Sequence, residues 1–295
     1  MRDANENTIT DAVLERFANT PEPRLKKLVE AVVRHLHALV QETEPTFEEW
    51  QAAIDFLTRT GQMCSDVRQE FILLSDVLGV SMLVDAINHR QPAGATETTV
   101  LGPFHVAGAP QPAHGADISA GLPGEKLLVE GVVESAIGGA VSGAVVEVWS
   151  ADQDGYYDVQ RPEIEGAALR ATFHTDEGGR FHFWTVMPAA YPIPNDGPVG
   201  ALLAATARHP YRPAHVHFMI SAPGYERLVT HIFAEDSPYL DSDAVFGVKN
   251  SLIEPFVAEP PGSAWDGRMM QQPWRHLTRR FGLKPTQSAS LPRSH

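Results

Sequence analysis

Two histidines placed two residues apart give the first indication of chemistry in this sequence. His215 and His217 lie in the segment RPAHVHF at 212–218, which has the pattern of a short β-strand. Because side chains alternate between the two faces of a strand, both imidazoles are expected on one face, where they can chelate one metal ion. The spacing alone leaves a second interpretation open, in which they are two polar residues on a solvated face.

Two tyrosines lie in segments of unusual local sequence. Tyr157 ends the segment WSADQDGYY at 149–157, and Tyr191 lies in the proline-rich segment MPAAYPIP at 187–194. Taken singly, each is best interpreted as a tyrosine in a turn. A functional interpretation therefore needs more than either segment alone.

Considered together, these segments resemble the intradiol ring-cleavage dioxygenases, a family whose iron is held by two tyrosinates and two histidines. The resemblance covers nearly the whole chain, through EFILLSDVLG at 70–79, LGPF at 101–104, GYY at 155–157, PAAYPIP at 188–194 and RHPYRPAHVH at 208–217. It implies one Fe(III) per chain, with the ligands Tyr157, Tyr191, His215 and His217. Tyr157 is chosen over Tyr156 because it aligns with the family's ligand when counted from Trp149 and Gly155.

These ligand types suit the chemistry of the family. Phenolate oxygens are hard, anionic donors, so two tyrosinates stabilise ferric over ferrous iron. A catechol-type substrate that loses both hydroxyl protons can chelate the ferric ion and becomes open to attack by O2. The resemblance implies that the substrate displaces Tyr191, which then takes one of those protons, so that Tyr191 is a catalytic residue as well as a ligand.

Arg212 is the second candidate catalytic residue. It lies three residues before His215, so strict alternation would place it on the opposite face unless Pro213 redirects the backbone. The resemblance instead places this arginine in the pocket, where its charge would stabilise negative charge that develops during the reaction. A surface ion pair is the alternative. His231, on a strand expected beside the ligand strand, is a candidate for orienting a ligand.

Within the family, the helical region and the loops at 191–198 and 239–247 most resemble hydroxyquinol 1,2-dioxygenases. The expected reaction is cleavage of hydroxyquinol (1,2,4-trihydroxybenzene) by O2 to 3-hydroxy-cis,cis-muconate, the enol form of maleylacetate. Cleavage of chlorocatechol or catechol is the alternative, and a non-catalytic metal- or lipid-binding β-sandwich is a more remote one. By the same resemblance, the substrate-binding residues besides Arg212 are Leu73, Asp76, Val100, Leu101, Gly102, Pro103, Phe104, Ile193, Pro194 and Val245.

Asp76 is the pocket residue that can accept a hydrogen bond from a third ring hydroxyl. A Ser-Asp pair at this place is common across the family, however. A helix cap or a polar network in the core would account for Asp76 equally well, and the sequence leaves this choice open.

The elements that must position these residues divide the chain in two. Up to residue 95, apolar residues at helical spacing predict three helical segments. The first carries an apolar stripe, the second begins at a capping box formed by Thr46 and Glu49, and the third is the segment 65–88, with a break near Gly79. The segment 65–88 is apolar nearly all round and is expected to be buried. The first helix carries an apolar stripe, which consists of Leu25, Leu28, Val29, Val32, Leu36, Leu39 and Val40.

From residue 96 onward, short runs rich in Val, Phe and Thr alternate with turn residues, which predicts strands at 127–133, 145–150, 170–175, 180–186, 215–221 and 228–233. The predicted fold class is therefore α+β. A helical dimerisation region at residues 1–95 precedes a β-sandwich catalytic domain at 96–295. The C-terminal tail from about Pro260 is expected to be irregular, with disorder at 287–295.

Composition and charge exclude several classes of function. A formal charge of −14 repels phosphate backbones, so nucleic acid is not an expected partner. No apolar run approaches the roughly 20 residues of a membrane span. The single cysteine, Cys64, excludes an internal disulfide, and no signal-peptide pattern opens the sequence, which favours a cytoplasmic protein.

The expected partners are a small aromatic diol or triol, O2, and a second copy of the chain. The apolar stripe needs burial that a self-sufficient sandwich does not provide, which predicts a homodimer through the N-terminal helices. The resemblance adds a bound phospholipid at that interface.

Overall fold

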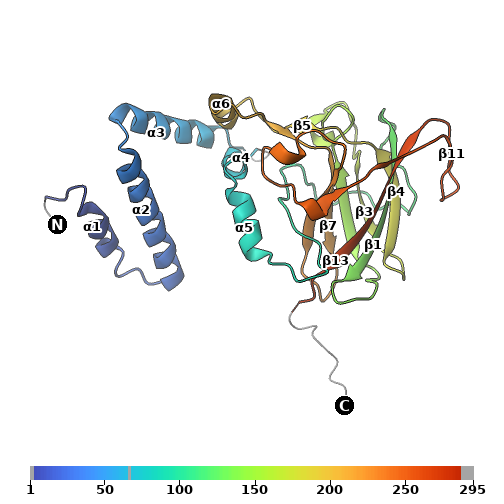
Figure 1. Cartoon of the computed structure of the whole chain (residues 1–295), viewed down its shortest axis with the longest axis horizontal. Helices are drawn as coiled ribbons and strands as arrows, with labels where there is room; N and C mark the ends of the chain where they lie inside the picture. Colours follow the sequence, from blue (N-terminus) through green and yellow to red (C-terminus); the bar gives the residue numbers. More distant parts are fainter. Residues whose placement is uncertain (1–2, 66–67, 287–295) are drawn as a thin grey trace, which may run out of the picture. The chain divides into compact units, whose positions relative to one another are not determined.

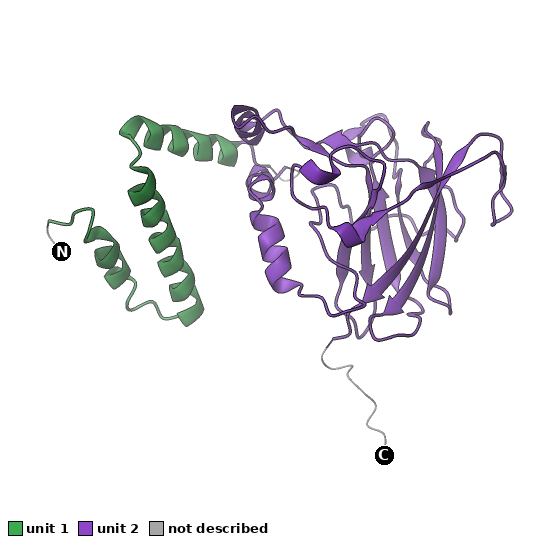
Figure 2. Cartoon of the chain, in the orientation of Figure 1, with its two compact units in different colours: residues 1–62 green, residues 63–295 purple. Residues whose placement is uncertain are grey.

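A computed structural model describes residues 3–65 and 68–286 of the chain (Figure 1). The chain forms two compact units, Met1–Gln62 and Met63–His295 (Figure 2). The division after Gln62 falls earlier than the boundary at residue 95 that the sequence suggested. The disorder expected at 287–295 concerns a segment outside the described residues. Helices and β-sheets together confirm the predicted α+β class.

The first unit consists of helices. These are α1 (Ile9–Arg16), α2 (Pro23–Thr43) and α3 (Phe47–Gln62). Helix α2 begins with a proline in its first turn, and the carboxylate of Glu22 accepts hydrogen bonds from the backbone N–H groups of Arg24 and Leu25. The predicted capping box is present before α3, because the backbone N–H of Thr46 donates to Glu49 (2.8 Å) and that of Glu49 to Thr46 (3.2 Å).

The helices of the second unit are α4 (Glu70–Val77), α5 (Val80–Asn88) and α6 (Pro198–Ala205). The expected break lies at Gly79, whose positive φ of 72° separates α4 from α5. The buried carboxylate of Glu70 accepts the backbone N–H of Val199 (3.2 Å), which satisfies an otherwise free donor at the start of α6. No helix among the described residues is long and apolar enough to cross a membrane.

The expected burial of the segment 65–88 was wrong for the chain taken by itself. Leu73 and Val77 are buried, but Leu83 and Val84 are 61% and 53% exposed. The buried residues of the two helices are Glu70, Leu73, Asp76 and Val77 on α4 and Asp85 on α5, whereas the apolar residues of α5 are at least partly exposed within this unit. Apolar residues all round a helix therefore do not guarantee its burial within one chain.

The rest of the second unit is a β-sandwich of two sheets (Figure 1). One sheet has the order β10-β13-β1-β4, and the other has the order β3-β2-β7-β8-β9. Their strands are β1 (Lys126–Ser135), β2 (Val145–Ser150), β3 (Arg170–His174), β4 (Arg180–Val186), β7 (His215–Ser221), β8 (Leu228–Ala234), β9 (Ile253–Glu254), β10 (Val257–Glu259) and β13 (Trp274–Leu283). Two short pairs, β5 (Tyr191–Pro192) with β6 (Tyr211–Arg212) and β11 (Gly262–Ser263) with β12 (Met269–Met270), complete the described strands.

Strand β13 contradicts the irregular C-terminal tail that the sequence suggested. It pairs in parallel with β1 over ten positions, from Lys126 opposite Trp274 to Ser135 opposite Leu283. Its basic residues hid the strand pattern. Arg275 and Arg279 lie on the same side of the strand as the core residues Leu277 and Phe281 and form ion pairs with Glu125 and Glu254, whereas Arg280 lies on the other side and pairs with Glu134.

The core lies between the two sheets and explains which face of β7 is free for chemistry. Val216, Phe218 and Ile220 point into this core and are at most 1% exposed. Phe218 contacts Phe281 of the opposite sheet at a ring-centroid distance of 4.7 Å. Because side chains alternate along a strand, His215 and His217 therefore point to the outer face of the five-stranded sheet.

Candidate metal centre and active site

The strands on either side of β7 hold the imidazole of His217 in place. In the sheet, His217 lies opposite Trp149 on β2 and opposite His231 on β8. The indole of Trp149 stacks on the His217 ring with centroids 4.6 Å apart, and His231 meets its other side edge-on at 4.0 Å. His217 is 1% exposed, so its polar ring is shielded from solvent and held between its neighbours.

Tyr157 and Tyr191 reach the same face from loops. Tyr157 immediately precedes a 3-10 turn, η1 (Asp158–Gln160), and its ring stacks on Phe104 at 4.3 Å. Tyr157 is fully buried, whereas Tyr156 is 49% exposed and lies under the Arg161 guanidinium. Of the two adjacent tyrosines, the structure thus brings Tyr157 to the histidines.

Gly155 allows the Tyr191 backbone to approach this turn. A Cβ on Gly155 would lie 2.8 Å from the Cβ of Tyr191, and the φ of Gly155 is +87°. Any other residue would be both strained and in collision. The glycine of the GYY segment is therefore required for the two tyrosines to meet.

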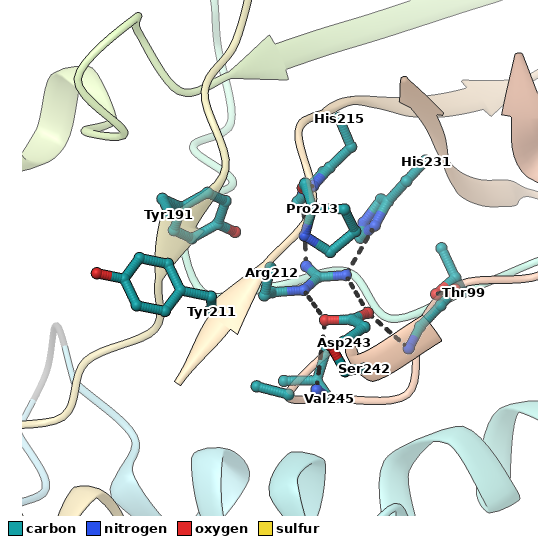
Figure 3. Close-up of polar contacts among 12 residues, drawn as sticks. Thr99, Tyr191, Tyr211, Arg212, Pro213, His215, His231, Ser242, Asp243 and Val245 are labelled. Carbon is teal, nitrogen blue, oxygen red and sulfur yellow. Dashed lines mark hydrogen bonds and ion pairs between the residues drawn. The ribbon is translucent and has the colours of Figure 1, made fainter. Parts of the chain in front are cut away.

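Four side-chain donor atoms converge at one point. The hydroxyl oxygen of Tyr157 lies 3.1 Å from that of Tyr191 and 2.7 Å from Nε2 of His217. Nε2 of His217 lies 3.1 Å from Nε2 of His215. Ligand atoms that bind one ion at about 2 Å lie about 3 Å apart, so this set has the spacing of a metal centre. Figure 3 shows two of these residues, Tyr191 and His215, beside Arg212.

Protonation of the two histidines supports the same interpretation. Nδ1 of His215 donates to the carbonyl oxygen of Pro213 (2.7 Å), so the free lone pair of the neutral ring is on Nε2. Burial and the nearby charge of Arg212 lower the pKa of His215 to about 3. Burial and the His215 ring likewise hold the pKa of His217 well below its usual value. Both rings are therefore neutral and able to bind a cation.

The Tyr157 hydroxyl needs a cation to ionise. Burial, together with the adjacent Tyr191, raises the pKa of Tyr157 well above 10. A phenolate at this position would be unstable without compensation, and a bound metal ion supplies that positive charge. Two phenol oxygens and two imidazole nitrogens form a hard donor set that fits an iron ion.

Arg212 lies inside the site. It is 2% exposed, and its Nη1 lies 3.4 Å from Nε2 of His215 (Figure 3). The alternation argument did not apply to it because Pro213 and Ala214 separate β6 from β7. Its burial rules out the surface ion pair that the sequence left open.

The structure gathers several of the expected pocket residues beside this centre. Leu73, Ile193 and Val245 form one apolar cluster, with Val100 packed against it. Gly102, with φ +76°, faces the His217 ring so closely that a Cβ would lie 3.3 Å from its Cε1 atom. Leu101 and Pro103 are exposed, and Pro194 is half-buried.

Asp76 is buried near the arginine. Burial raises its pKa, while a hydrogen bond with Ser81 and the charge of Arg212 act in the opposite direction. Only 7% of the residue is exposed, so an acidic group is held at the end of α4, beside the apolar cluster.

Sequence reasoning missed Asp243 and left His231 undecided. Asp243 binds Arg212 from 31 positions away in the sequence, and no local pattern announces such a contact. His231 lies opposite His217, so the expected position of its strand beside the ligand strand is confirmed. Its Nδ1 lies 3.3 Å from Nη2 of Arg212, and the candidate ligand atoms of His215, His217 and His231 all lie within 4.8 Å of one another.

Comparison with known proteins identifies the class. Residues 100–265 match the family model described as Dioxygenase, and residues 22–96 match the one described as Catechol dioxygenase N terminus. The chain therefore belongs to the intradiol ring-cleavage dioxygenases, a family of enzymes with non-haem iron.

Individual relatives show which members of the family this chain resembles. The chain is 56% identical to a 6-chlorohydroxyquinol 1,2-dioxygenase of Cupriavidus pinatubonensis, over 89% of this chain and 95% of the relative. The crystal structure of the hydroxyquinol 1,2-dioxygenase of Pseudomonas putida DLL-E4 has a TM-score of 0.90 and 48% identity, and the match covers 95% of this chain and 99% of that one. The catechol 1,2-dioxygenase of Pseudomonas arvilla C-1 has a TM-score of 0.82 but only 29% identity, with 97% and 95% covered.

Proposed function

We propose that this protein cleaves hydroxyquinol with O2 between its two adjacent hydroxylated carbons, at one Fe(III) held by Tyr157, Tyr191, His215 and His217. The observation that carries the proposal is the convergence of two phenol oxygens and two imidazole nitrogens at spacings of 2.7–3.1 Å. The greater identity to enzymes named for hydroxyquinols than to the catechol enzyme supports this substrate.

The reaction inserts both atoms of O2. The carbon–carbon bond between the two hydroxylated carbons breaks, each of these carbons becomes a carboxylate carbon, and the product is 3-hydroxy-cis,cis-muconate. When bound, a ferric ion would chelate the two adjacent substrate oxygens and draw electron density from the ring, which opens it to O2. The protein supplies the remaining functions.

Each residue near the centre has a distinct proposed task. Tyr157, His215 and His217 would hold the ion, because stacking and strand pairing fix at least the rings of Tyr157 and His217. Tyr191 lies on a short two-residue strand, and its hydroxyl oxygen would accept a substrate proton. Arg212 presents a fixed positive charge to the negative charge that develops on the ring.

The pocket wall is proposed to select the ring. The proposed wall consists of Leu73, Asp76, Val100, Leu101, Gly102, Pro103, Phe104, Ile193, Pro194 and Val245, together with Arg212. A buried acid such as Asp76 is satisfied by a third ring hydroxyl but left without that partner when plain catechol binds.

A substrate panel tests the proposal. We expect kcat/KM, measured by O2 uptake, to be higher for hydroxyquinol than for catechol or 4-chlorocatechol. A preference for either of those two would make this a catechol or chlorocatechol enzyme. 6-Chlorohydroxyquinol belongs in the panel because of the Cupriavidus relative, and a preference for it would show that the wall accommodates a chlorine.

The visible spectrum tests catalysis against mere binding. A ferric centre with tyrosinate ligands absorbs visible light through ligand-to-metal charge transfer, so the purified protein should be red-brown. A non-catalytic lipid-binding sandwich would be colourless. Iron analysis should give one ion per chain.

A homodimer through the N-terminal helices is a further part of the proposal, together with a phospholipid bound between them and a cytoplasmic location. Leu25, Val32 and Leu36 of the stripe are each more than half exposed in the single chain, and such surface is normally covered by a partner. Light scattering at micromolar concentration should give the mass of two chains, and a monomer would contradict it. Mass spectrometry of a solvent extract tests the lipid, and cell fractionation tests the location.

A further inference from the structure

We propose that Asp243 is a positioning residue that links the substrate-pocket wall to the charge of Arg212, through the loop from Asp243 to Gly247. The proposal rests on the role of Arg212 proposed above. It adds that ring selection and reaction rate depend on the same carboxylate.

The first support is the geometry of the ion pair. The Asp243 carboxylate accepts hydrogen bonds from Nε (3.0 Å) and Nη2 (3.3 Å) of Arg212, one to each oxygen (Figure 3). Two such bonds fix the plane of a guanidinium as well as its position. Arg212 and Asp243 are 2% and 5% exposed, so water does not compete for either group. The remaining nitrogen, Nη1, is thereby directed to His215 (3.4 Å).

The same carboxylate shapes the loop that carries Val245. It accepts the backbone N–H groups of Gly247 (2.9 Å) and Val245 (3.4 Å). Val245 belongs to the apolar cluster with Leu73 and Ile193 that forms the pocket wall. A displacement of Asp243 would therefore move the wall and the guanidinium together.

Gly247 shows how closely the loop fits around the arginine. A Cβ at this position would lie 2.9 Å from Nη2 of Arg212, 3.0 Å from Oγ1 of Thr99 and 3.1 Å from Oδ2 of Asp243. The φ of Gly247 is not positive, so the lack of space and not the backbone conformation requires glycine here. Thr99 also holds the loop, since its hydroxyl donates to the carbonyl of Gly247 (2.9 Å).

The electrostatic surroundings of the pair favour its ionised form. Burial alone would raise the pKa of Asp243, but the charge and hydrogen bonds of Arg212 outweigh burial and hold this pKa below its usual value. A neutral amide at position 243 would keep most of the shape and remove the charge. This makes Asp243→Asn the informative substitution.

A double-mutant cycle tests the proposal, with Asp243→Asn, Arg212→Leu and the double variant. If Asp243 acts through Arg212, Asp243→Asn should lower kcat about 10-fold in the wild type and have no further effect on kcat in the Arg212→Leu background. An equal loss in both backgrounds would overturn the proposal, because it would show a merely structural role. Full kcat in the single Asp243→Asn variant would overturn it as well.

Gly247→Ala is an independent probe of the same contact. Gly247→Ala should lower kcat in the otherwise wild-type protein. In the Arg212→Leu background it should leave kcat unchanged, because leucine has no Nη2 for the added Cβ to displace. Gly178→Ala is the matched control, since Gly178 is exposed in a turn and its φ is also not positive. A loss of kcat in the Arg212→Leu background equal to that in the wild type would contradict the proposal.

Two readouts do not depend on turnover. Anaerobic titration with 4-nitrocatechol, followed by its absorbance, should give a changed Kd for Asp243→Asn if the wall moves. Asp85→Asn is the control, because Asp85 is a buried acid with its own partners, Thr98 and Lys249. Thermal unfolding of iron-free protein shows whether each variant folds. An unchanged Kd, together with an unchanged ratio of kcat/KM for hydroxyquinol and catechol, would refute the link to the wall.

The cycle also separates this inference from the proposed function. The cycle uses the substrate of the panel that the enzyme cleaves fastest. The coupling between the effects of the two substitutions on kcat can therefore be measured even if the substrate is not hydroxyquinol. If Arg212→Leu alone keeps full kcat, the proposed role of Arg212 fails, and the dependence of Asp243 on it fails with it.

Discussion

The sandwich and the helical region differ in how far their apolar side chains are buried. Val129, Phe218 and Leu277 between the sheets are completely buried, and in the site Tyr157 and Arg212 bind Tyr191 and Asp243. On helices α2 and α5, by contrast, Leu36 and Leu83 are 55% and 61% exposed. Both regions carry similar residues, so composition does not decide the outcome.

The difference teaches which part of the molecule is complete in one chain. Full burial of one leucine contributes about 1.5–3 kcal/mol relative to exposure, and the sandwich gains this many times over from its own residues. The exposed apolar side chains of the helices do not contribute this burial free energy within a single chain. The residues of the site thus bind one another within one chain, whereas the helices are where the proposed second chain would add burial.

The largest effect is expected from removing one of the four proposed metal ligands. His217→Ala should remove bound iron and activity together, since it deletes the imidazole that lies 2.7 Å from Tyr157 and 3.1 Å from His215. Iron analysis and the visible spectrum are the measurements. His174→Ala, an exposed histidine on β3, is the control and should keep both. Full iron content in His217→Ala would show that the four-ligand assignment is wrong.

A pair of leucine substitutions tests the comparison directly. Leu277→Ala, in the core, should lower the free energy of unfolding by about 2–5 kcal/mol. Leu83→Ala should change it by only about 0.5 kcal/mol where the protein is monomeric. Urea unfolding of iron-free protein at several concentrations measures both. A large, concentration-dependent cost of Leu83→Ala would show that a partner chain covers α5.

Arg212→Leu should lower kcat and kcat/KM alike by about 100-fold while iron is retained. The charge that this arginine meets grows only as the reaction proceeds, so binding of the substrate should change little. Steady-state kinetics and iron analysis measure this. An increase of KM with kcat unchanged would instead make Arg212 a residue that only binds the substrate.

The smallest effect on the reaction is expected for a pocket residue that a helix contributes. Asp76→Asn should reduce the preference for hydroxyquinol over catechol by about 10-fold, because an amide no longer accepts as strongly from the third hydroxyl. The ratio of the two kcat/KM values is the measurement. A variant with its full preference would remove Asp76 from the pocket while leaving the enzyme class intact.

Local patterns predicted much of the fold. The limits of β2, β4 and β7 agree with the predicted strands because alternating Val and Phe residues mark a half-buried surface. Helix α6 was missed because its eight residues are uniformly apolar and follow a proline-rich loop. Strand β13 was missed because its arginines are neutralised by acids that are distant in sequence, which no local window contains.

The site could be predicted only in part for the same reason. Spacing alone pointed to His215 and His217, and the tyrosines required the family resemblance. Arg212 was correctly placed in the interior by the resemblance, against the simple alternation rule. Asp243 had no signal, because its contact with Arg212 arises from tertiary structure and not from a repeating local pattern.

The parallel pairing of β1 with β13 has a consequence for how the protein is made. Strand β1 begins at Lys126, and its neighbour β13 begins only at Trp274. At typical rates of synthesis of about 5–20 residues per second, β1 waits on the order of ten seconds for this partner. Until then one edge of a hydrophobic strand lacks its neighbour and can pair with another nascent chain. A chain that stops before about residue 274 would therefore be prone to aggregate even though every proposed iron ligand has already been synthesised.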